Sequence, residues 1–368
     1  MIVTVSPTEN LQGTIQLPAS KSYSIRAFII AACGGCSTII RPSDCDDAGV
    51  AMAAARHMGA SLVRRAGGVW HVRQSRLFSK RFDQINVKES GTVLRFLLPL
   101  LGLQQRNVRV VGEGTLKGRP NGHLLQTLRS CGMMIRGAGD RESVPIDFSG
   151  GKLRGGTIEI DGSLSSQFIS ALLIACPQLE EDTRIAITGE KQVSSDYITM
   201  TQSVLAKSGV KVQKVHSRLF VIKGGQRFRG LKNFTVPSDY GLAAFLMAAA
   251  ALVRSDVVFE GHFNDRMIQA DGKILDFLKA MGVRFVRTKT AITMKGPFPL
   301  RGGTFSLKDC PDLVPIMAVL ALFAKGKTRL CDIHHARAKE SDRISDLRQE
   351  LLKVGGQVAE TENELIIE

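Results

Sequence analysis

The chain has 368 residues, of which 44% are hydrophobic, 23% charged and 6% aromatic. This composition excludes a disordered, collagen-like or coiled-coil protein, and the length suits two globular domains. The longest apolar runs fall well short of the roughly 20 residues that a membrane-spanning helix needs. The first residues also lack the basic and then apolar pattern of a secretory signal. We therefore expect a cytoplasmic protein without a membrane segment.

The charge balance indicates what kind of ligand to expect. The chain carries 49 Lys and Arg against 34 Asp and Glu, a formal net charge of +15 that favours an anionic ligand. Nucleic acid is a poor candidate, because one Trp, three Tyr and no compact basic tract offer little for stacking and phosphate contacts. The seven Cys are scattered, and the Cys33 and Cys36 pair lacks the further ligands that zinc requires. We expect neither a metal site nor a nucleic-acid partner.

One amphipathic helix pattern recurs five times, and each copy ends in glycine before a β-rich run. The glycines are Gly59, Gly132, Gly209, Gly282 and Gly355, spaced by 73, 77, 73 and 73 positions. Glycine just past a helix favours a left-handed C-terminal cap, because it has no Cβ to clash. In the last copy Ile344, Leu347, Leu351 and Val354 follow helical spacing, which predicts one apolar face packed in the core.

A second helix pattern, apolar nearly all round, falls between these copies after a strand and a short polar turn. Helices of this kind are buried, so we expect five inner helices covered by the amphipathic outer ones. A Ser or Asp at each start predicts an N-cap, and plain capping is the alternative for any single helix. Parallel packing would collect the N-termini into a positive floor for phosphate and carboxylate groups. The five starts lie near Ser22, Ser90, Ser165, Asp239 and Asp312.

The period of about 73 residues also predicts how the repeats divide into domains. A sixth inner helix would fall near residue 385, whereas only a strand-like tail follows Gly355. We therefore expect five units and part of a sixth, arranged as two domains of three. The boundary after the third unit falls in the basic, glycine-containing stretch at residues 223–234.

Eight motifs, in a fixed order, make the whole chain resemble the 5-enolpyruvylshikimate-3-phosphate synthase family. They are LPASKSYSIRA (17–27), ESGTVLRF (89–96), GRPNGHL (118–124), DGSLSSQF (161–168), SSDYI (194–198), SDYGLAAFLMAAAA (238–251), DCPDLVPIMAVLALFAKG (309–326) and ARAKESDRISDL (336–347). A single match would be weak evidence. Together, set on the repeat described above, they make the resemblance specific.

The resemblance implies an α/β, two-domain enolpyruvyl-transferase-like fold of repeated βαβαββ units with buried parallel helices. The first strand would join the second domain. Residues 14–228 then form the first domain with three units, and residues 1–13 plus 229–368 form the second with two units and part of a third. The two domains would close around the substrates, and we expect the chain to act as a monomer.

The resemblance further implies transfer of the enolpyruvyl group of phosphoenolpyruvate to the 5-hydroxyl of shikimate 3-phosphate. The reaction releases phosphate through a tetrahedral intermediate and needs no cofactor. Phosphate and carboxylate groups are well bound by Lys as a point charge and by Arg as a bidentate fork. The positions matching the shikimate 3-phosphate site are Lys21, Ser22, Arg26, Ser165, Ser166, Gln167, Ser194, Tyr197, Asp312 and Lys339. Those matching the phosphoenolpyruvate site are Lys21, Gly91, Arg119, Gln167 and Arg343.

The implied catalytic residues are Asp312, Glu340 and Lys21. Asp312 would take the proton of the 5-hydroxyl, while Glu340 and Lys21 would serve the methylene carbon and the leaving phosphate. For Glu340 and Arg343 the alternative is an ordinary charged helix start. Lys339 and Arg343 lie four residues apart on one helical face, where an anion would offset their repulsion.

Some positions depart from the family pattern. Glu89 stands where Asn is usual, Phe96 where many members have Pro, and Ser195 with Asp196 where Lys-Pro is common. A carboxylate at the entrance to an anion site is unfavourable unless it is paired, and we expect Arg95 as a partner for Glu89.

Family members continue beyond the position of Glu368 with an Asp-His-Arg helix start and a later Lys, which complete the phosphoenolpyruvate site. These 368 residues hold neither, so we expect shikimate 3-phosphate to bind and turnover to be slow. Two alternatives stay open. One is a related transferase acting on a nucleotide sugar, although the Cys usual in its loop near Arg119 is missing from residues 112–120. The other is a non-catalytic protein that binds shikimate 3-phosphate.

Overall fold

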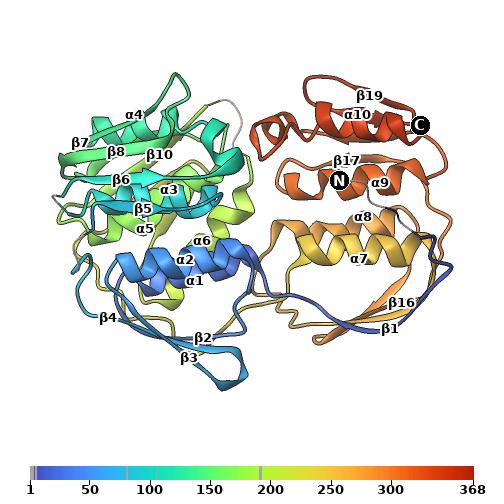
Figure 1. Cartoon of the computed structure of the whole chain (residues 1–368), viewed down its shortest axis with the longest axis horizontal. Helices are drawn as coiled ribbons and strands as arrows, with labels where there is room; N and C mark the ends of the chain where they lie inside the picture. Colours follow the sequence, from blue (N-terminus) through green and yellow to red (C-terminus); the bar gives the residue numbers. More distant parts are fainter. Residues whose placement is uncertain (1–3, 5, 80–81, 105, 190–192) are drawn as a thin grey trace. The chain divides into compact units, whose positions relative to one another are not determined.

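The structure is a computed structural model that describes residues 4, 6–79, 82–104, 106–189 and 193–368. The chain divides into two compact units, unit 1 with residues 1–18, 237–337 and 342–368, and unit 2 with residues 19–236 and 338–341. Both are built from a repeated βαβαββ pattern (Figure 1), which confirms the predicted fold class. No helix within the described ranges is both long and apolar enough to cross a membrane.

Each repeat contributes one four-stranded sheet, and all five sheets share a topology. The first two strands run parallel and the remaining pairs antiparallel. A parallel pair needs a long crossover, which the inner helix supplies. In unit 2 the sheets are β13 (Phe234–Thr235), β2 (Gly35–Ile40), β4 (Val69–Gln74), β3 (Ser61–Arg65); β5 (Gln84–Asn86), β6 (Val108–Val111), β8 (Ser143–Gly151), β7 (Met133–Ala138); and β9 (Gly156–Asp161), β10 (Thr183–Thr188), β12 (Leu219–Ile222), β11 (Gln213–His216). In unit 1 they are β1 (Asn10–Gln16), β14 (Arg254–Glu260), β16 (Ala291–Met294), β15 (Phe285–Arg287); and β17 (Thr304–Ser306), β18 (Thr328–Cys331), β20 (Leu365–Ile367), β19 (Val358–Glu360).

The tail after Gly355 does not start a further unit, contrary to the expectation from the period. It forms the hairpin of β19 and β20, and β20 pairs antiparallel with β18. This pairing completes the fifth sheet, so the tail belongs to the fifth repeat.

The five inner helices are mostly buried, and four of them carry the predicted N-cap. They are α1 (Lys21–Ala31), α3 (Gly91–Leu101), α5 (Ser166–Ala175), α7 (Tyr240–Leu252) and α9 (Val314–Leu322). The capping side chains and the backbone N–H groups from which they accept are Ser20 with Tyr23, Ser90 with Val93, Ser165 with Gln167, and Asp239 with Leu242. The first cap is therefore Ser20, because the helix begins one residue before Ser22.

The prediction that Asp312 caps the fifth inner helix is wrong. Asp312 lies in a 3₁₀ turn, η5 (Pro311–Leu313), ahead of α9, and makes no cap bond. Its carboxylate accepts a hydrogen bond from Arg343 instead. Pro315 in the first turn of α9 has no N–H, which leaves one donor fewer for a cap to satisfy.

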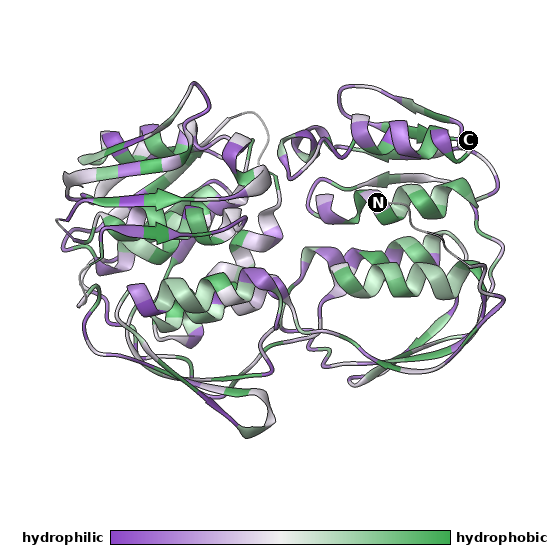
Figure 2. Ribbon diagram, viewed as in Figure 1, coloured by the Kyte–Doolittle hydropathy of each residue, from purple (hydrophilic) through white to green (hydrophobic). Residues whose placement is uncertain are grey.

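The prediction that every inner helix is buried all round fails for α7. Leu242 and Phe245 each expose 47% of their surface, although the opposite side of the helix is buried. Figure 2 shows the apolar colour running along α7. Unit 2 packs three inner helices together, whereas the described residues of unit 1 include two, α7 and α9, so one flank of α7 has no helix against it.

The outer helices confirm the role of the repeating glycines. They are α2 (Asp46–His57), α4 (Gly122–Ser130), α6 (Ser195–Lys207), α8 (Ile274–Ala280) and α10 (Ser345–Lys353). The glycine after each has positive φ, with values of 100°, 96°, 88°, 99° and 86° in chain order. The predicted apolar face of α10 is partly wrong, because Val354 follows the last helical residue and is 75% exposed.

A glycine in the predicted boundary stretch of residues 223–234 allows two backbone segments to pack closely. Gly230 has φ of 86°, and a Cβ built on it would lie 2.1 Å from the carbonyl oxygen of Cys36. Gly225 also has positive φ, 64°, but a Cβ there would meet nothing within 4 Å. The two positions therefore separate the cost of the dihedral angle from the cost of a backbone clash.

We predict that Gly230→Ala lowers the free energy of unfolding by about 3 kcal/mol or more, because strain and a backbone clash add. Gly225→Ala, the matched control, should cost about 1 kcal/mol from the dihedral angle alone. Equilibrium urea unfolding followed by circular dichroism measures both. Equal costs would show that the approach to Cys36 is unimportant.

Candidate active site

The first predicted site residue, Lys21, begins α1. Its Nζ lies 3.5 Å from Asp47 Oδ2 in the first turn of α2. Both side chains are partly exposed. Ser22 follows in the same turn, so α1 presents an ammonium and a hydroxyl next to the N-terminal end of its own helix dipole.

Arg26, one turn further along α1, is fully buried and ties α1 to α6. Its Nε donates to Thr201 Oγ1 at 2.8 Å, Nη1 to the carbonyl of Ser22 at 3.0 Å and Nη2 to the carbonyl of Tyr197 at 3.3 Å. The guanidinium carbon lies 5.2 Å from the ring centre of Phe96 and 5.8 Å from that of Tyr197. Burial lowers the pKa of Arg26 to about 10, so it stays protonated near neutral pH. Arg26 thereby fixes the backbone of two predicted ligand residues, Ser22 and Tyr197.

The starts of α5 and α6 hold four more predicted residues. Ser165 Oγ accepts from Gln167 N at 3.3 Å as the cap of α5, and Ser166 is buried in the first turn. Ser194 precedes α6 in the left-handed conformation with φ of 54°. A non-glycine residue in this conformation is strained and is held by its surroundings, as is common at ligand sites.

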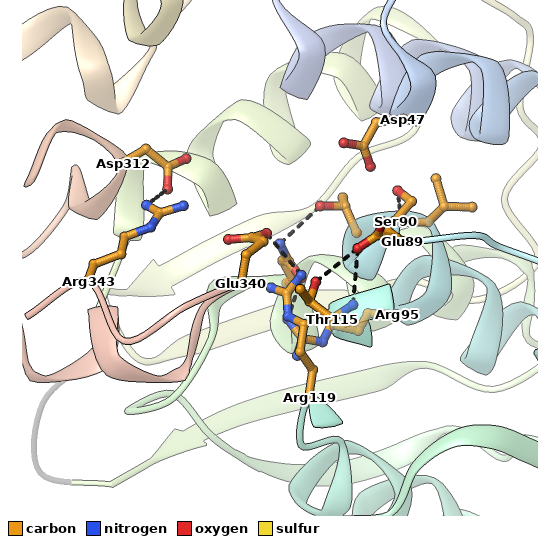
Figure 3. Close-up of polar contacts among 12 residues, drawn as sticks. Asp47, Glu89, Ser90, Arg95, Thr115, Arg119, Asp312, Glu340 and Arg343 are labelled. Carbon is orange, nitrogen blue, oxygen red and sulfur yellow. Dashed lines mark hydrogen bonds and ion pairs between the residues drawn. The ribbon is translucent and has the colours of Figure 1, made fainter. Parts of the chain in front are cut away.

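Arg119 lies against the first turn of α3. It follows the 3₁₀ turn η2 (Gly114–Gly118), is buried, and donates from Nη1 to Glu340 Oε1 at 3.0 Å. A Cβ at Gly91 would lie 2.7 Å from Nη1, so only glycine allows this approach. Within the described part of the chain, the buried Nε–H of Arg119 has no hydrogen-bond partner. The side chain is therefore a cation with unused donor capacity at a helix N-terminus (Figure 3).

Glu89 does not pair with Arg95, contrary to our expectation. Its Oε2 accepts from the backbone N of Thr115 at 3.1 Å and from the Thr115 hydroxyl at 3.2 Å (Figure 3). Gly114 makes room, since a Cβ there would lie 2.3 Å from Glu89 Oε2. The reason is that Arg95 is saturated elsewhere, as its contacts below show. The carboxylate thus holds the turn that leads to Arg119.

In unit 1, Asp312 and Arg343 form a pair (Figure 3). Arg343 Nη1 donates to Asp312 Oδ1 at 2.5 Å and to the carbonyl of Pro311 at 3.1 Å. Lys339 and Glu340 belong to the short segment 338–341 that groups with unit 2. Unit 2 accordingly contains all the predicted site residues except Asp312 and Arg343.

Sequence reasoning missed Arg95 as a site-forming residue. It is buried among the first turns of α3 and α5, near Arg119 (Figure 3). An arginine inside an otherwise apolar helix pattern was the available indication. No group of three His, Cys, Asp or Glu in the described ranges is arranged to hold a metal ion.

Comparison with known proteins places this arrangement in a family. The family model for EPSP synthase (3-phosphoshikimate 1-carboxyvinyltransferase) matches residues 5–368. Proteins named 3-phosphoshikimate 1-carboxyvinyltransferase are similar over the full chain, at 36% identity in Methanosarcina acetivorans and 38% in Methanothrix thermoacetophila. The chain covers 85% and 86% of these relatives.

Solved structures agree in fold. EPSP synthase from Acinetobacter baumannii is similar with a TM-score of 0.77 and 26% identity, covering 98% of this chain and 82% of that one. The enolpyruvyl transferase NikO from Streptomyces tendae shares the fold, with a TM-score of 0.75, 19% identity and the same coverage. The repeated fold and its cationic helix starts define an enolpyruvyl-transferring enzyme. More specifically, the chain belongs to the EPSP synthase (3-phosphoshikimate 1-carboxyvinyltransferase) family.

We predict that Gly91→Ala raises the KM for phosphoenolpyruvate by about tenfold or more, because the added methyl displaces the Arg119 guanidinium and a lost charged contact costs a few kcal/mol. Gly118→Ala in the same loop, where a Cβ meets nothing within 4 Å, is the matched control. Steady-state kinetics at saturating shikimate 3-phosphate give the result. An unchanged KM in Gly91→Ala would show that Arg119 does not bind this substrate.

Proposed function

We propose that this chain transfers the enolpyruvyl group of phosphoenolpyruvate to the 5-hydroxyl of shikimate 3-phosphate and releases phosphate. The observation that carries the proposal is the polar start of the three inner helices of unit 2. Their N-terminal turns bring Lys21, Ser166 and Gln167 together with the glycine that admits Arg119. Helix N-termini with added cations suit two substrates that each carry phosphate and carboxylate groups.

For shikimate 3-phosphate we propose ligands from three segments of unit 2 and one turn of unit 1. The contacts of Arg26 support a holding role for it beside any direct contact, since three of its N–H donors are already bound to Thr201, Ser22 and Tyr197. The proposed set is Lys21, Ser22, Arg26, Ser165, Ser166, Gln167, Ser194, Tyr197, Asp312 and Lys339.

For phosphoenolpyruvate we propose Lys21, Gly91, Arg119, Gln167 and Arg343. The unused Nε–H of Arg119 supports its part, because a buried donor without a partner costs free energy that a ligand oxygen recovers. Arg343 is already bound to Asp312 by one nitrogen, and its fork geometry leaves further N–H groups for a carboxylate.

The proposed reaction is an addition followed by an elimination. The 5-hydroxyl oxygen attacks C2 of the enol phosphate while Asp312 takes the hydroxyl proton, and C3 gains a proton from Glu340 or Lys21. The tetrahedral adduct then loses a proton from C3 as the bond from C2 to the phosphate oxygen breaks, which regenerates the double bond. Proton transfer by placed side chains contributes about 10² to 10⁴ in rate.

We predict that Glu340→Gln lowers kcat by about 10² or more, because the amide cannot exchange the C3 proton. Affinity for shikimate 3-phosphate should stay within about twofold, since the amide oxygen still accepts from Arg119. The assay is phosphate release from the two substrates, with exposed Glu350→Gln on α10 as the control. A kcat equal to that of the unmodified chain would exclude Glu340 from proton transfer.

The same proposal includes where and with what the chain works. We propose a monomer acting in the cytoplasm on small-molecule substrates, with no nucleic-acid partner. The scarcity of aromatic side chains and the small-molecule names of the relatives support this.

A further inference from the structure

We propose that Arg95 is a positioning residue that fixes the side-chain amide of Gln167 with its nitrogen directed at the substrates. The inference rests on the function proposed above, in which Gln167 contacts both substrates. It adds a residue whose effect passes through Gln167, without contact between Arg95 and either substrate.

Arg95 is held from several sides inside unit 2. Its exposed fraction is 4%, and Nη1 donates to Gln167 Oε1 at 2.6 Å. Nε donates to Asn121 Oδ1 at 3.2 Å, and Nη2 to the carbonyl of Pro120 at 3.1 Å. The guanidinium carbon also lies 5.1 Å from the ring centre of Phe168. A guanidinium held by three hydrogen bonds and a ring has one available geometry.

The orientation of the Gln167 amide follows from chemistry. A guanidinium donates and cannot accept, so the atom facing Arg95 is the carbonyl oxygen, and Nε2 must face away. Nε2 donates to Thr92 Oγ1 at 3.0 Å. Its second N–H has no partner among the residues that the structure describes. Thr92 alone could not set this orientation, because a hydroxyl either donates or accepts.

The orientation matters because the substrates are rich in anionic oxygens. With Oε1 bound to Arg95, Gln167 offers an N–H to a phosphate, carboxylate or hydroxyl oxygen. With the amide reversed, it would offer a carbonyl oxygen, and two acceptors facing each other repel. Arg95 therefore decides whether Gln167 attracts or repels its ligand.

Arg95 also reaches the segment that carries Arg119. Asn121 accepts from Arg95 Nε and donates from Nδ2 to the carbonyl of Arg119 at 3.1 Å. One buried guanidinium is thus joined both to Gln167 on α5 and to the chain around Arg119.

The test is a double-mutant cycle on the full chain, using Arg95→Met, Gln167→Ala and both together. We expect Arg95→Met to weaken binding of shikimate 3-phosphate, followed by calorimetry, by about tenfold to 100-fold. In the Gln167→Ala background the same change should weaken binding by less than about threefold. If Arg95 only supports the fold, its loss should cost an equal factor in both backgrounds, and that result would overturn the proposal.

Isosteric variants keep the test decisive if Arg95→Met does not fold. Gln167→Glu retains an acceptor for Arg95 but offers oxygen to the ligand, so binding should fall at least as far as in Gln167→Ala. Arg95→Lys, also a pure donor, should recover part of the affinity. Thr92→Val, the matched control, removes the other amide contact and should change affinity less than about threefold. A Gln167→Glu variant that binds normally would contradict the proposed orientation.

Calorimetry needs no turnover, so the cycle is independent of the reaction proposed for the chain. Phosphate release by the unmodified chain tests that reaction separately. If the chain binds shikimate 3-phosphate without turning over, the proposed reaction fails, while the cycle still decides the role of Arg95.

Discussion

Burial of positive charge is the constraint on which the polar end of unit 2 depends. Removing a guanidinium from water costs several kcal/mol unless its N–H groups find partners in good geometry. Arg26 and Arg95 are both buried within the first two turns of inner helices, and their partners come from other helices and loops. Burial lowers the pKa of Arg95 to about 9, and the neighbouring Arg119 lowers it further while Glu340 opposes the change. Satisfying these two charges fixes Tyr197, Gln167 and the chain around Asn121, and so arranges the candidate site.

The repeats explain how one backbone pattern builds an asymmetric site. Arg26, Arg95 and Ser170 occupy similar places in α1, α3 and α5, four or five residues after each helix begins. Arg26 and Ser170 meet at Thr201, whose hydroxyl lies 2.8 Å from the first and 3.0 Å from the second. Arg95 is bonded instead to Gln167 and Asn121. Equivalent positions in three repeats thus carry different polar groups, which suits a ligand without threefold symmetry.

Features governed by local chemistry could be predicted from the sequence. The glycines after the outer helices and the caps at Ser90, Ser165 and Asp239 depend on residues within one turn, and the motif pattern predicted the family. Long-range packing could not be predicted in the same way. The partners of Arg95 lie 26 and 72 residues away, and nothing in the local pattern distinguishes a buried arginine from an exposed one. The exposure of Phe245 and the pairing of Asp312 with Arg343 also depend on distant elements.

The most direct measurement is a calorimetric titration of the purified chain with shikimate 3-phosphate. It tests the central claim that the polar starts of α1 and α5 hold this substrate. The unmodified chain should give a saturating heat, and Lys21→Ala combined with Ser166→Ala should abolish it while circular dichroism stays unchanged. Retained affinity in the folded double variant would contradict the account.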